Sequence, residues 1–402
     1  MATSNPQSMG DGAQKVATAN NTFGLKLYQV LGSERDDNLV FAPLSITTSL
    51  AMTYMGARGK TAEQMEEVMA LEPLGQNLHA DIRDHNAVLV CEDGPYNMRM
   101  ANRLYGQKKF TFEPKFLDAT HELYNAKLEA LDFEGNSESA RQAINDWVEE
   151  QTERRIQDLI APGVLTKDTR LVLVNAIYFK AEWLYPFPKH TTQEQPFHLS
   201  SSKKITVPMM SQTQHFGYFH DKSLTHVNCK ILRMMFKGIG HANKLEMMAV
   251  LPDSIKDLAK LETTLSPSLI QNWRSKTKMA KVRVTFPKFK LTQDFSLAEK
   301  LNGIGMSDLF SEESADLRGV STDDELFVSD VIHKAFVEVN EDGCEAAAAT
   351  AVTMREKGVA LFRRPKPEPK IFKADHPFLF FIQSIESGAI VFMGRVKRPQ
   401  PN

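Results

Sequence analysis

The first part of the chain carries apolar residues at the spacing of amphipathic helices. Within residues 18–32, Phe23, Leu27 and Val30 fall on one helical face, and Gly32 follows as a stop signal. The same pattern predicts a short strand followed by helices over 38–69, and helices at 114–126, 137–150, 255–273 and 294–302.

Strand patterns dominate the second half of the chain. Short apolar runs, partly alternating with polar residues and bounded by polar turns, are typical of sheet strands. They occur at residues 98–107, 170–183, 244–253, 281–291, 328–339 and 377–396. Helices thus cluster early and strands late, without the regular strand–helix alternation of parallel α/β proteins. We expect one α+β domain over residues 16–402 with mixed or antiparallel sheets, preceded by a small, polar, disordered segment at 1–15.

The composition of the chain argues against nucleic-acid and membrane partners and against a disulfide framework. The 402 residues include 48 Lys or Arg and 50 Asp or Glu, so no global field would attract nucleic acid or an acidic membrane. Three cysteines, Cys91, Cys229 and Cys344, predict no disulfide framework. No secretory signal and no apolar stretch of about 18 residues is visible. We therefore expect a cytoplasmic protein, or an extracellular one exported without a visible signal peptide.

Patterns for catalysis and cofactor binding are missing. The sequence has no GxSxG elbow, Walker loop, HExxH helix or CxxC pair. His79 with His85, and His215 with His220, lack the helical spacing of metal ligands. We expect no enzyme, no catalytic residue, no cofactor and no metal site.

Residues 343–358, GCEAAAATAVTMREKG, have two competing interpretations. Alanine has the highest intrinsic helix propensity, so local preference favours a helix. Read with period two, the segment is a strand whose one face is small or apolar, comprising Cys344, Ala346, Ala348, Thr350, Val352 and Met354. A segment that moves from a loop into a packed sheet needs such a face and a flexible pivot, which Gly343 supplies. The Pro- and Lys-rich RRPKPEPK that follows predicts an extended, solvated chain.

At this point the sequence resembles a known family. The stretch VNEDGCEAAAATAV is similar to the hinge of the reactive-centre loop of serpins, the serine protease inhibitors. The resemblance continues from Asn21 to Pro399 through NLVFAPLSITTSLAM, LVNAIYFKAEW, VTFPKFKL, SDVIHKAFVEVNEDG, ADHPFLFFI and GAIVFMGRV. In overall look the chain is similar to the ovalbumin-like intracellular branch. The resemblance implies a metastable fold of three β-sheets and eight to nine helices, with an exposed reactive-centre loop at about 341–372.

The implied activity is suicide-substrate inhibition. A serpin of this kind traps a protease as a covalent acyl-enzyme while the cleaved loop inserts into the main sheet as a new strand. The family's loop length places the reactive bond between Lys357 and Gly358, with Arg355 and Arg363 as alternatives. A lysine there suits trypsin-like serine proteases. Two alternatives remain: a non-inhibitory serpin used for storage, chaperoning or ligand carriage, and an inhibitor of cysteine proteases.

The resemblance also assigns structural roles. The hinge would comprise Glu341, Gly343, Cys344, Glu345, Ala346, Ala347, Ala348 and Ala349. The sheet-opening cluster would comprise Ser45, Asn175, His333, Trp183 and Lys288, with Lys288 pairing Glu341. Serpins usually carry Thr or Ser at the position of Cys344, and a cysteine in an exposed loop could oxidise. The helix expected at 77–90 has one arginine among several acids, so no heparin site is expected. We expect a monomer at risk of polymerisation, because its sheet accepts strands.

Overall fold

The apolar runs pair into two β-sheets in the computed structural model, which describes residues 10–90, 96–223, 227–238, 244–323, 325–344 and 368–400. The six-stranded sheet has the order β10 (Phe289–Ser296), β11 (Val328–Val339), β12 (Gly343–Cys344), β4 (Leu171–Glu182), β2 (Tyr96–Gln107) and β3 (Leu128–Leu131). The nine-stranded sheet has the order β1 (Leu39–Phe41), β15 (Ile390–Val396), β14 (Phe378–Ser384), β8 (Leu245–Pro252), β7 (Cys229–Met235), β6 (Lys204–Asp221), β9 (Lys278–Pro287) and β13 (Lys370–Lys373), and β5 (Gln193–His198) pairs with β6. Each sheet contains parallel and antiparallel pairs, which confirms the predicted mixed sheets.

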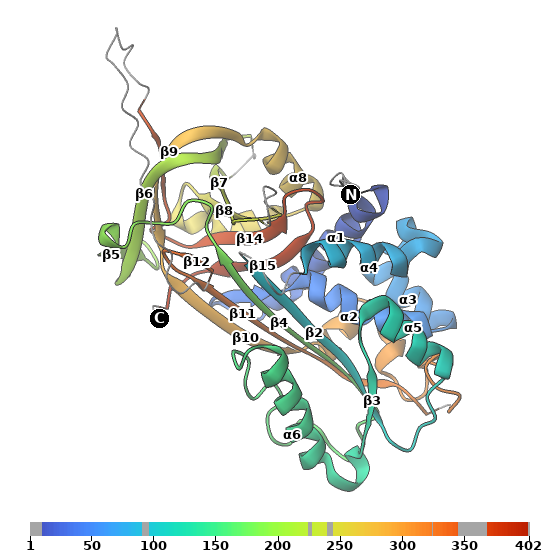
Figure 1. Ribbon diagram of the computed structural model, residues 1–402. Coiled ribbons are helices and arrows are strands. Elements are labelled where there is room, and N and C mark those ends of the chain that lie inside the picture. The colour runs from blue at the N-terminus through green and yellow to red at the C-terminus, as the bar shows by residue number, and fades with distance from the viewer. Residues whose placement is uncertain are drawn as a thin grey trace, which may run out of the picture.

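The helices pack on both sheets. They are α1 (Asp11–Ser33), α2 (Pro43–Gly56), α3 (Gly59–Met69), α4 (Leu78–Leu89), α5 (Pro114–Tyr124), α6 (Phe133–Gln151), α7 (Leu258–Thr264), α8 (Pro267–Lys276) and α9 (Ala298–Gly303), with short 3₁₀ turns at Glu72–Asn77, Lys189–Thr191, Ile255–Asp257 and Asp308–Phe310. Helices α1 and α8 pack on the nine-stranded sheet, α2 on both, and α6 on the six-stranded sheet. Figure 1 shows α6 on one side of this sheet, apart from the group formed by α1 to α5. None of the described helices is both long enough and apolar enough to cross a bilayer.

Strand β4 is buried on both faces and so forms the centre of the fold. Ile177 and Phe179 contribute to the core between the two sheets. Val174 and Tyr178 point the other way and pack with Ile144 of α6. This arrangement explains why the run at 170–183 is almost continuously apolar, since neither face meets water.

The α+β class is confirmed, and two of the three expected sheets are joined into one ladder. Strand β6 runs without a break for 18 residues. It pairs with β5 and β9 along its first part and with β7 at its end, so one strand belongs to both ladders.

Three predicted boundaries differ from the structure. Helix α1 begins at Asp11, inside the segment expected to be disordered. Residues 294–296, predicted as helix, belong to β10 because Phe295 and Ser296 pair with β11. The helix predicted at 255–273 is divided between α7 and α8, since the Ser266 side chain accepts a hydrogen bond from the Leu269 N–H and Pro267 starts a new helix.

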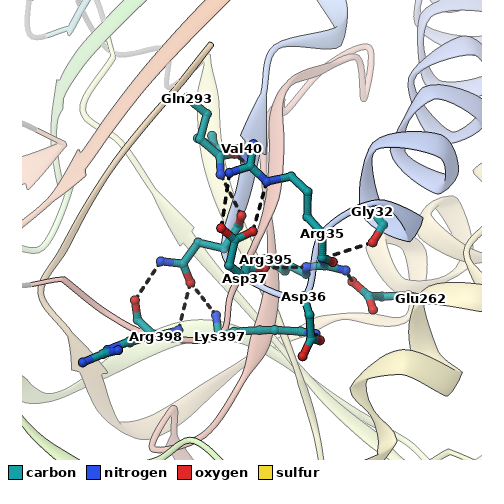
Figure 2. Close-up of polar contacts among 11 residues, drawn as sticks. Gly32, Arg35, Asp36, Asp37, Val40, Glu262, Gln293, Arg395, Lys397 and Arg398 are labelled. Atoms are coloured by element: carbon teal, nitrogen blue, oxygen red, sulfur yellow. Dashed lines mark hydrogen bonds and ion pairs between the residues drawn. The ribbon is translucent and has the colours of Figure 1, made fainter. Parts of the chain in front are cut away.

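A buried arginine ties the two ends of the chain together (Figure 2). Arg395 of β15 donates from Nη1 to Glu262 Oε1 at 2.8 Å and from Nε to the Asp37 carbonyl at 2.9 Å. Its Nη2 donates to the carbonyls of Gly32, at 3.2 Å, and Arg35. The guanidinium therefore closes the loop that follows α1 and fixes this loop against the last strand.

Candidate functional site

The main sheet is open at one end. Strands β4 and β11 pair directly and in parallel from Leu171 with Val328 to Tyr178 with Phe336. Beyond this point β12 lies between them, pairing antiparallel with β4 and with Val339 of β11. The sheet thus holds two residues of an additional strand at its open end, while its remaining length is closed.

Backbone geometry at β12 demands glycine and a small neighbour. Gly343 has φ of 154°, and a Cβ placed there would lie 1.9 Å from the Ala181 carbonyl oxygen. Besides the predicted pivot role, the structure thus gives a second reason for a glycine at position 343, which is the close approach of its backbone to β4. Cys344 is fully buried in the core between the sheets and pairs with Ala181. The expectation that Cys344 lies in an exposed, oxidisable loop is therefore wrong for this conformation.

Predicted residues Trp183, Lys288 and Glu341 meet around the open end. Trp183 donates its indole N–H to the Asn340 carbonyl at 3.0 Å, and its backbone N–H bonds the Asp342 carbonyl at 2.8 Å. Lys288 Nζ lies 2.9 Å from Glu341 Oε2, as the resemblance implied. These contacts hold the chain in place just before β12.

Glu341 is charged although it is buried. Burial acts to raise the pKa of its carboxyl, but hydrogen bonds from Lys288 and from Thr192, at 2.7 Å, outweigh burial and keep the pKa below its ordinary value. Asp342 next to it pairs with Lys189 at 3.0 Å. The two acids anchor the start of the predicted reactive-centre loop at about 341–372, which we call the bait segment, to separate parts of the fold.

The other predicted residues form a second polar cluster, where β4 and β11 still pair. Asn175 Nδ2 donates to Ser45 Oγ at 2.5 Å and also to Asn102 Oδ1. His333 bonds Asn175 Oδ1 across the seam between the strands. Sequence reasoning missed Asn102, whose only signal was a polar residue at a central position of an otherwise partly apolar strand.

Two further buried hydroxyls lie along α2, beyond Ser45. The hydroxyls of Ser49 and Thr53, one and two turns along α2 from Ser45, are buried and have no hydrogen-bond partner within the described ranges. Unpaired buried polar groups of this kind lower the stability of the folded state.

His333 is neutral, and its hydrogen bonds fix the tautomer. The Ala42 backbone N–H donates to its Nε2 at 3.1 Å, so Nδ1 carries the proton and donates to Asn175. Burial lowers the pKa of this imidazole to about 3. Burial likewise lowers the pKa values of His79 and His85 to about 4.

Acid should destabilise the fold through these histidines. Each has a lower pKa in the folded chain than in the unfolded chain, so below about pH 6.5 the unfolded state binds more protons. Stability present at pH 7 should fall by up to about 1.4 kcal/mol per pH unit for each histidine as the pH drops toward 4. Melting temperatures measured between pH 7.5 and 4.5 check this.

A matched pair of variants assigns the effect. His333→Gln should melt at a lower temperature at pH 7.5 and lose less on acidification than the wild type. His198→Gln, at an exposed histidine, should follow the wild-type curve. Identical acid sensitivity in the wild type and His333→Gln would contradict the assignment.

The remaining predicted site residues lie outside the described part of the chain. They are Glu345, Ala346, Ala347, Ala348, Ala349, Arg355, Lys357, Gly358 and Arg363, and Cys91 is also outside. Within the described ranges, no group of three His, Cys, Asp or Glu residues could hold a metal ion. His79 bonds Tyr124, and His85 Nε2 lies 3.0 Å from Ser387 Oγ.

Comparisons with known proteins agree with this geometry. The family model for serpins (serine protease inhibitors) matches residues 18–399. Leukocyte elastase inhibitor of Homo sapiens is 39% identical over 393 residues, covering 96% of this chain and 100% of that protein. The Sus scrofa protein of the same name is 40% identical over 393 residues, with the same coverage.

Solved structures show the same fold. Uncleaved ovalbumin matches with a TM-score of 0.84 and 30% identity, covering 96% of this chain and 100% of that chain. Serpin48 of the insect Tenebrio molitor matches with a TM-score of 0.84 and 32% identity, covering 98% and 100%. With its strand-accepting sheet and these relatives over nearly its whole length, the chain belongs to the serpin family.

Proposed function

We propose that this serpin inhibits serine proteases by suicide-substrate trapping and is not itself a catalyst. The supporting observation is β12, because Gly343 and Cys344 already lie between β4 and β11 with the Cys344 side chain in the core. The names of the relatives point the same way, since leukocyte elastase inhibitors match over 96% of the chain.

The register of β12 indicates how far the loop inserts. Gly343 pairs with Glu182 and Cys344 with Ala181. Continued antiparallel pairing would bring Thr350 beside Asn175 of the polar cluster and Met354 beside Leu171, where β4 begins. Residues 343–354 therefore match the length of the slot.

The same register gives the direction of each side chain. Cys344 and its partner Ala181 both belong to the core between the sheets. Side chains at alternate positions share a face, so Ala346, Ala348, Thr350, Val352 and Met354 would also point inward. This is the small or apolar face of the period-two pattern, and it offers no charge to be buried.

Slot length supports Lys357–Gly358 as the reactive bond. Lys357 lies three residues beyond Met354, so after cleavage the inserted loop would hold the protease close to the far end of the sheet. Cleavage after Arg363 would leave six more residues, or roughly 20 Å of slack at strand rise. Cleavage after Arg355 would leave two residues fewer and an even tauter loop, so Arg355 stays as the alternative. Both basic residues favour trypsin-like proteases.

The chemistry of trapping needs only the protease's own machinery. The protease serine oxygen attacks the Lys357 carbonyl carbon, the bond to Gly358 nitrogen breaks, and the new amino terminus leaves with a proton. An ester then links Lys357 to the protease. About ten further ladder residues at roughly 1 kcal/mol each, plus apolar burial, supply on the order of 10 to 20 kcal/mol. This is comparable to the roughly 5 to 15 kcal/mol stability of a protein domain, so the protease can be deformed before it hydrolyses the ester.

Other partner expectations continue as part of this proposal. The α4 segment pairs its Arg83 with the adjacent Asp84 at 2.8 Å, which leaves no cationic helix face for heparin. We propose a monomer without nucleic-acid or membrane partners, in the cytoplasm or exported without a signal.

An SDS-stable complex is the expected result when the chain is mixed with trypsin. Mass spectrometry should find a released C-terminal fragment that begins at Gly358, and Lys357→Ala should form at least about tenfold less complex with trypsin because the specificity pocket loses its charged ligand. Elastase should be tested in parallel, because the relatives are named elastase inhibitors. A stable complex with elastase would indicate a reactive bond after a small residue. Complete cleavage of the chain without a stable complex would show that it is a substrate and would favour the non-inhibitory alternative. A stable complex with cysteine proteases alone would favour the cysteine-protease alternative.

A further inference from the structure

A long cationic segment lies largely outside the bait segment and the sheet-opening site, to which it contributes only Lys288. Residues 263–293 contain seven Lys or Arg and no Asp or Glu, although the whole chain is nearly neutral. The segment runs from the end of α7 through α8 and β9 into the first part of β10. Its charge is therefore a local feature that overall composition concealed.

Strand β9 presents part of this charge on one outward face. Met279, Lys281 and Arg283 alternate with buried Val282 and Val284, so their side chains share the solvent side of the sheet. Register extends the face to the neighbouring strands. His215 of β6 pairs with Lys281, while Thr213 of β6 and Ile371 of β13 flank Arg283. We call these six residues the outer β9 face.

The cations of this face have no acidic partners. Lys281 and Arg283 form no ion pair with any residue in the described ranges, and neither do the exposed Lys278 and Lys370 beside them. By contrast, Lys373, which is also on β13, pairs with Asp375 at 3.1 Å. Uncompensated like charges on one face attract an acidic surface and orient its approach.

Two apolar side chains stand among these cations. Ile371 is 60% exposed and Met279 is 58% exposed, the highest values among large apolar side chains in the described part of the protein. Methionine and arginine are enriched at protein interfaces, where apolar contact accompanies charge. A polysaccharide would use the cations alone, so the mixture favours a protein partner.

The position of the face indicates which protein. The bait segment leaves the sheet at β12 and returns to the fold at β13, whose Lys370 begins 13 residues after Lys357. This length spans at most about 45 Å even when fully extended. Figure 1 places β9 and β6 side by side at one end of the molecule, and the strand order puts β13 on the other side of β9. A protease bound to the bait is thus held near this surface.

We propose that the outer β9 face is a docking surface for the target protease, and that it selects proteases with an acidic surface beside the active site. This proposal rests on the proposed inhibitory function and adds a second determinant of specificity to the residue before the reactive bond. Lys281 and Arg283 would steer the encounter, while Met279 and Ile371 would contact the docked protease.

Two trypsins of opposite net charge give the sharpest test, because anionic and cationic trypsin share their preference for Lys and Arg. The wild type should inhibit anionic trypsin at least about tenfold faster at low salt, and the advantage should shrink as salt screens the charges. Lys281→Glu with Arg283→Glu should abolish or reverse this preference. Met279→Ser with Ile371→Ser should slow the inhibition of anionic trypsin.

A matched control separates local from overall charge. Lys115→Glu with Lys167→Glu makes the same charge change at exposed residues away from this face and should keep the wild-type preference. All variants should keep the wild-type melting temperature and number of protease molecules trapped per inhibitor, since neither the fold nor insertion is altered. Equal rates for the two trypsins in every variant would overturn the proposal.

Two further measurements keep the outcomes distinct. A wild type that traps neither trypsin would refute the proposed function. Docking could still be measured separately, by the binding of anionic trypsin whose nucleophilic serine is changed to alanine. Binding of a sulfated polysaccharide at 150 mM salt that needs Lys281 and Arg283, with unchanged trypsin rates, would overturn the protein-docking proposal in favour of a polysaccharide site.

Discussion

Ala346→Arg should convert the inhibitor into a substrate. Continued from β12, the register places residue 346 opposite Phe179, which is fully buried in the core between the sheets. An arginine at this place would have to bury an unpaired charge, at a cost of several kcal/mol, so insertion would stall while the ester hydrolyses. The number of inhibitor molecules consumed per trapped protease should rise at least about tenfold.

Glu345→Arg is the control for this experiment. The same register places residue 345 opposite Lys180, which is half-buried on the other face of β4. Its side chain would stay near solvent, where repulsion from Lys180 costs less than about 1 kcal/mol. Trapping by Glu345→Arg should therefore stay close to wild type. Equal effects of the two substitutions would contradict the proposed phase of the inserted strand.

Arg395→Met should be among the most destabilising single changes in the described part of the protein. The Arg395 and Glu262 side chains are 3% and 10% exposed, and Tyr28 also donates to Glu262 at 2.6 Å. Removing the guanidinium leaves the carboxylate buried with a single remaining partner and frees three backbone carbonyls. Loss of one member of a buried pair typically costs about 3 to 5 kcal/mol, which a lower melting temperature and urea midpoint would record.

Lys397→Met tests whether burial is the cause. Lys397 follows on the same segment and pairs with Asp36 at 2.6 Å, but Asp36 is fully exposed to solvent. This substitution should change stability by less than about 1 kcal/mol. A loss as large as that of Arg395→Met would mean that the C-terminal segment is sensitive to any change of charge.

Sequence patterns predicted the elements with strong periodicity and missed those set by distant partners. The runs that became β4, β8 and β14 were recognised because both of their faces are apolar. Strand β6 was not, since Pro208 and several polar residues interrupt its pattern and its pairing with β9 decides its structure. Residues 294–296 likewise follow β11 and not their own helical spacing.

The candidate site was predictable only through the family resemblance. No local rule connects Ser45, Asn175 and His333, which lie on three separate elements and meet only after folding. Period two indicated the inward face of the bait segment, but propensity favoured a helix equally well. The burial of Cys344 could not be foreseen, because it depends on the gap between β4 and Val339 at the end of β11.

The short strand β12 has a consequence for crowded solutions of this protein. A bait segment offered by a second molecule must first evict Gly343 and Cys344 from their own sheet before it can reach β4. Strand β12 thus occupies the open end of its own sheet. Because β12 is part of the same chain, it competes effectively with a strand from a second molecule. Polymerisation by strand exchange would then require the direct pairing of β4 with β11 to open, at the place where His333 is hydrogen-bonded to Asn175.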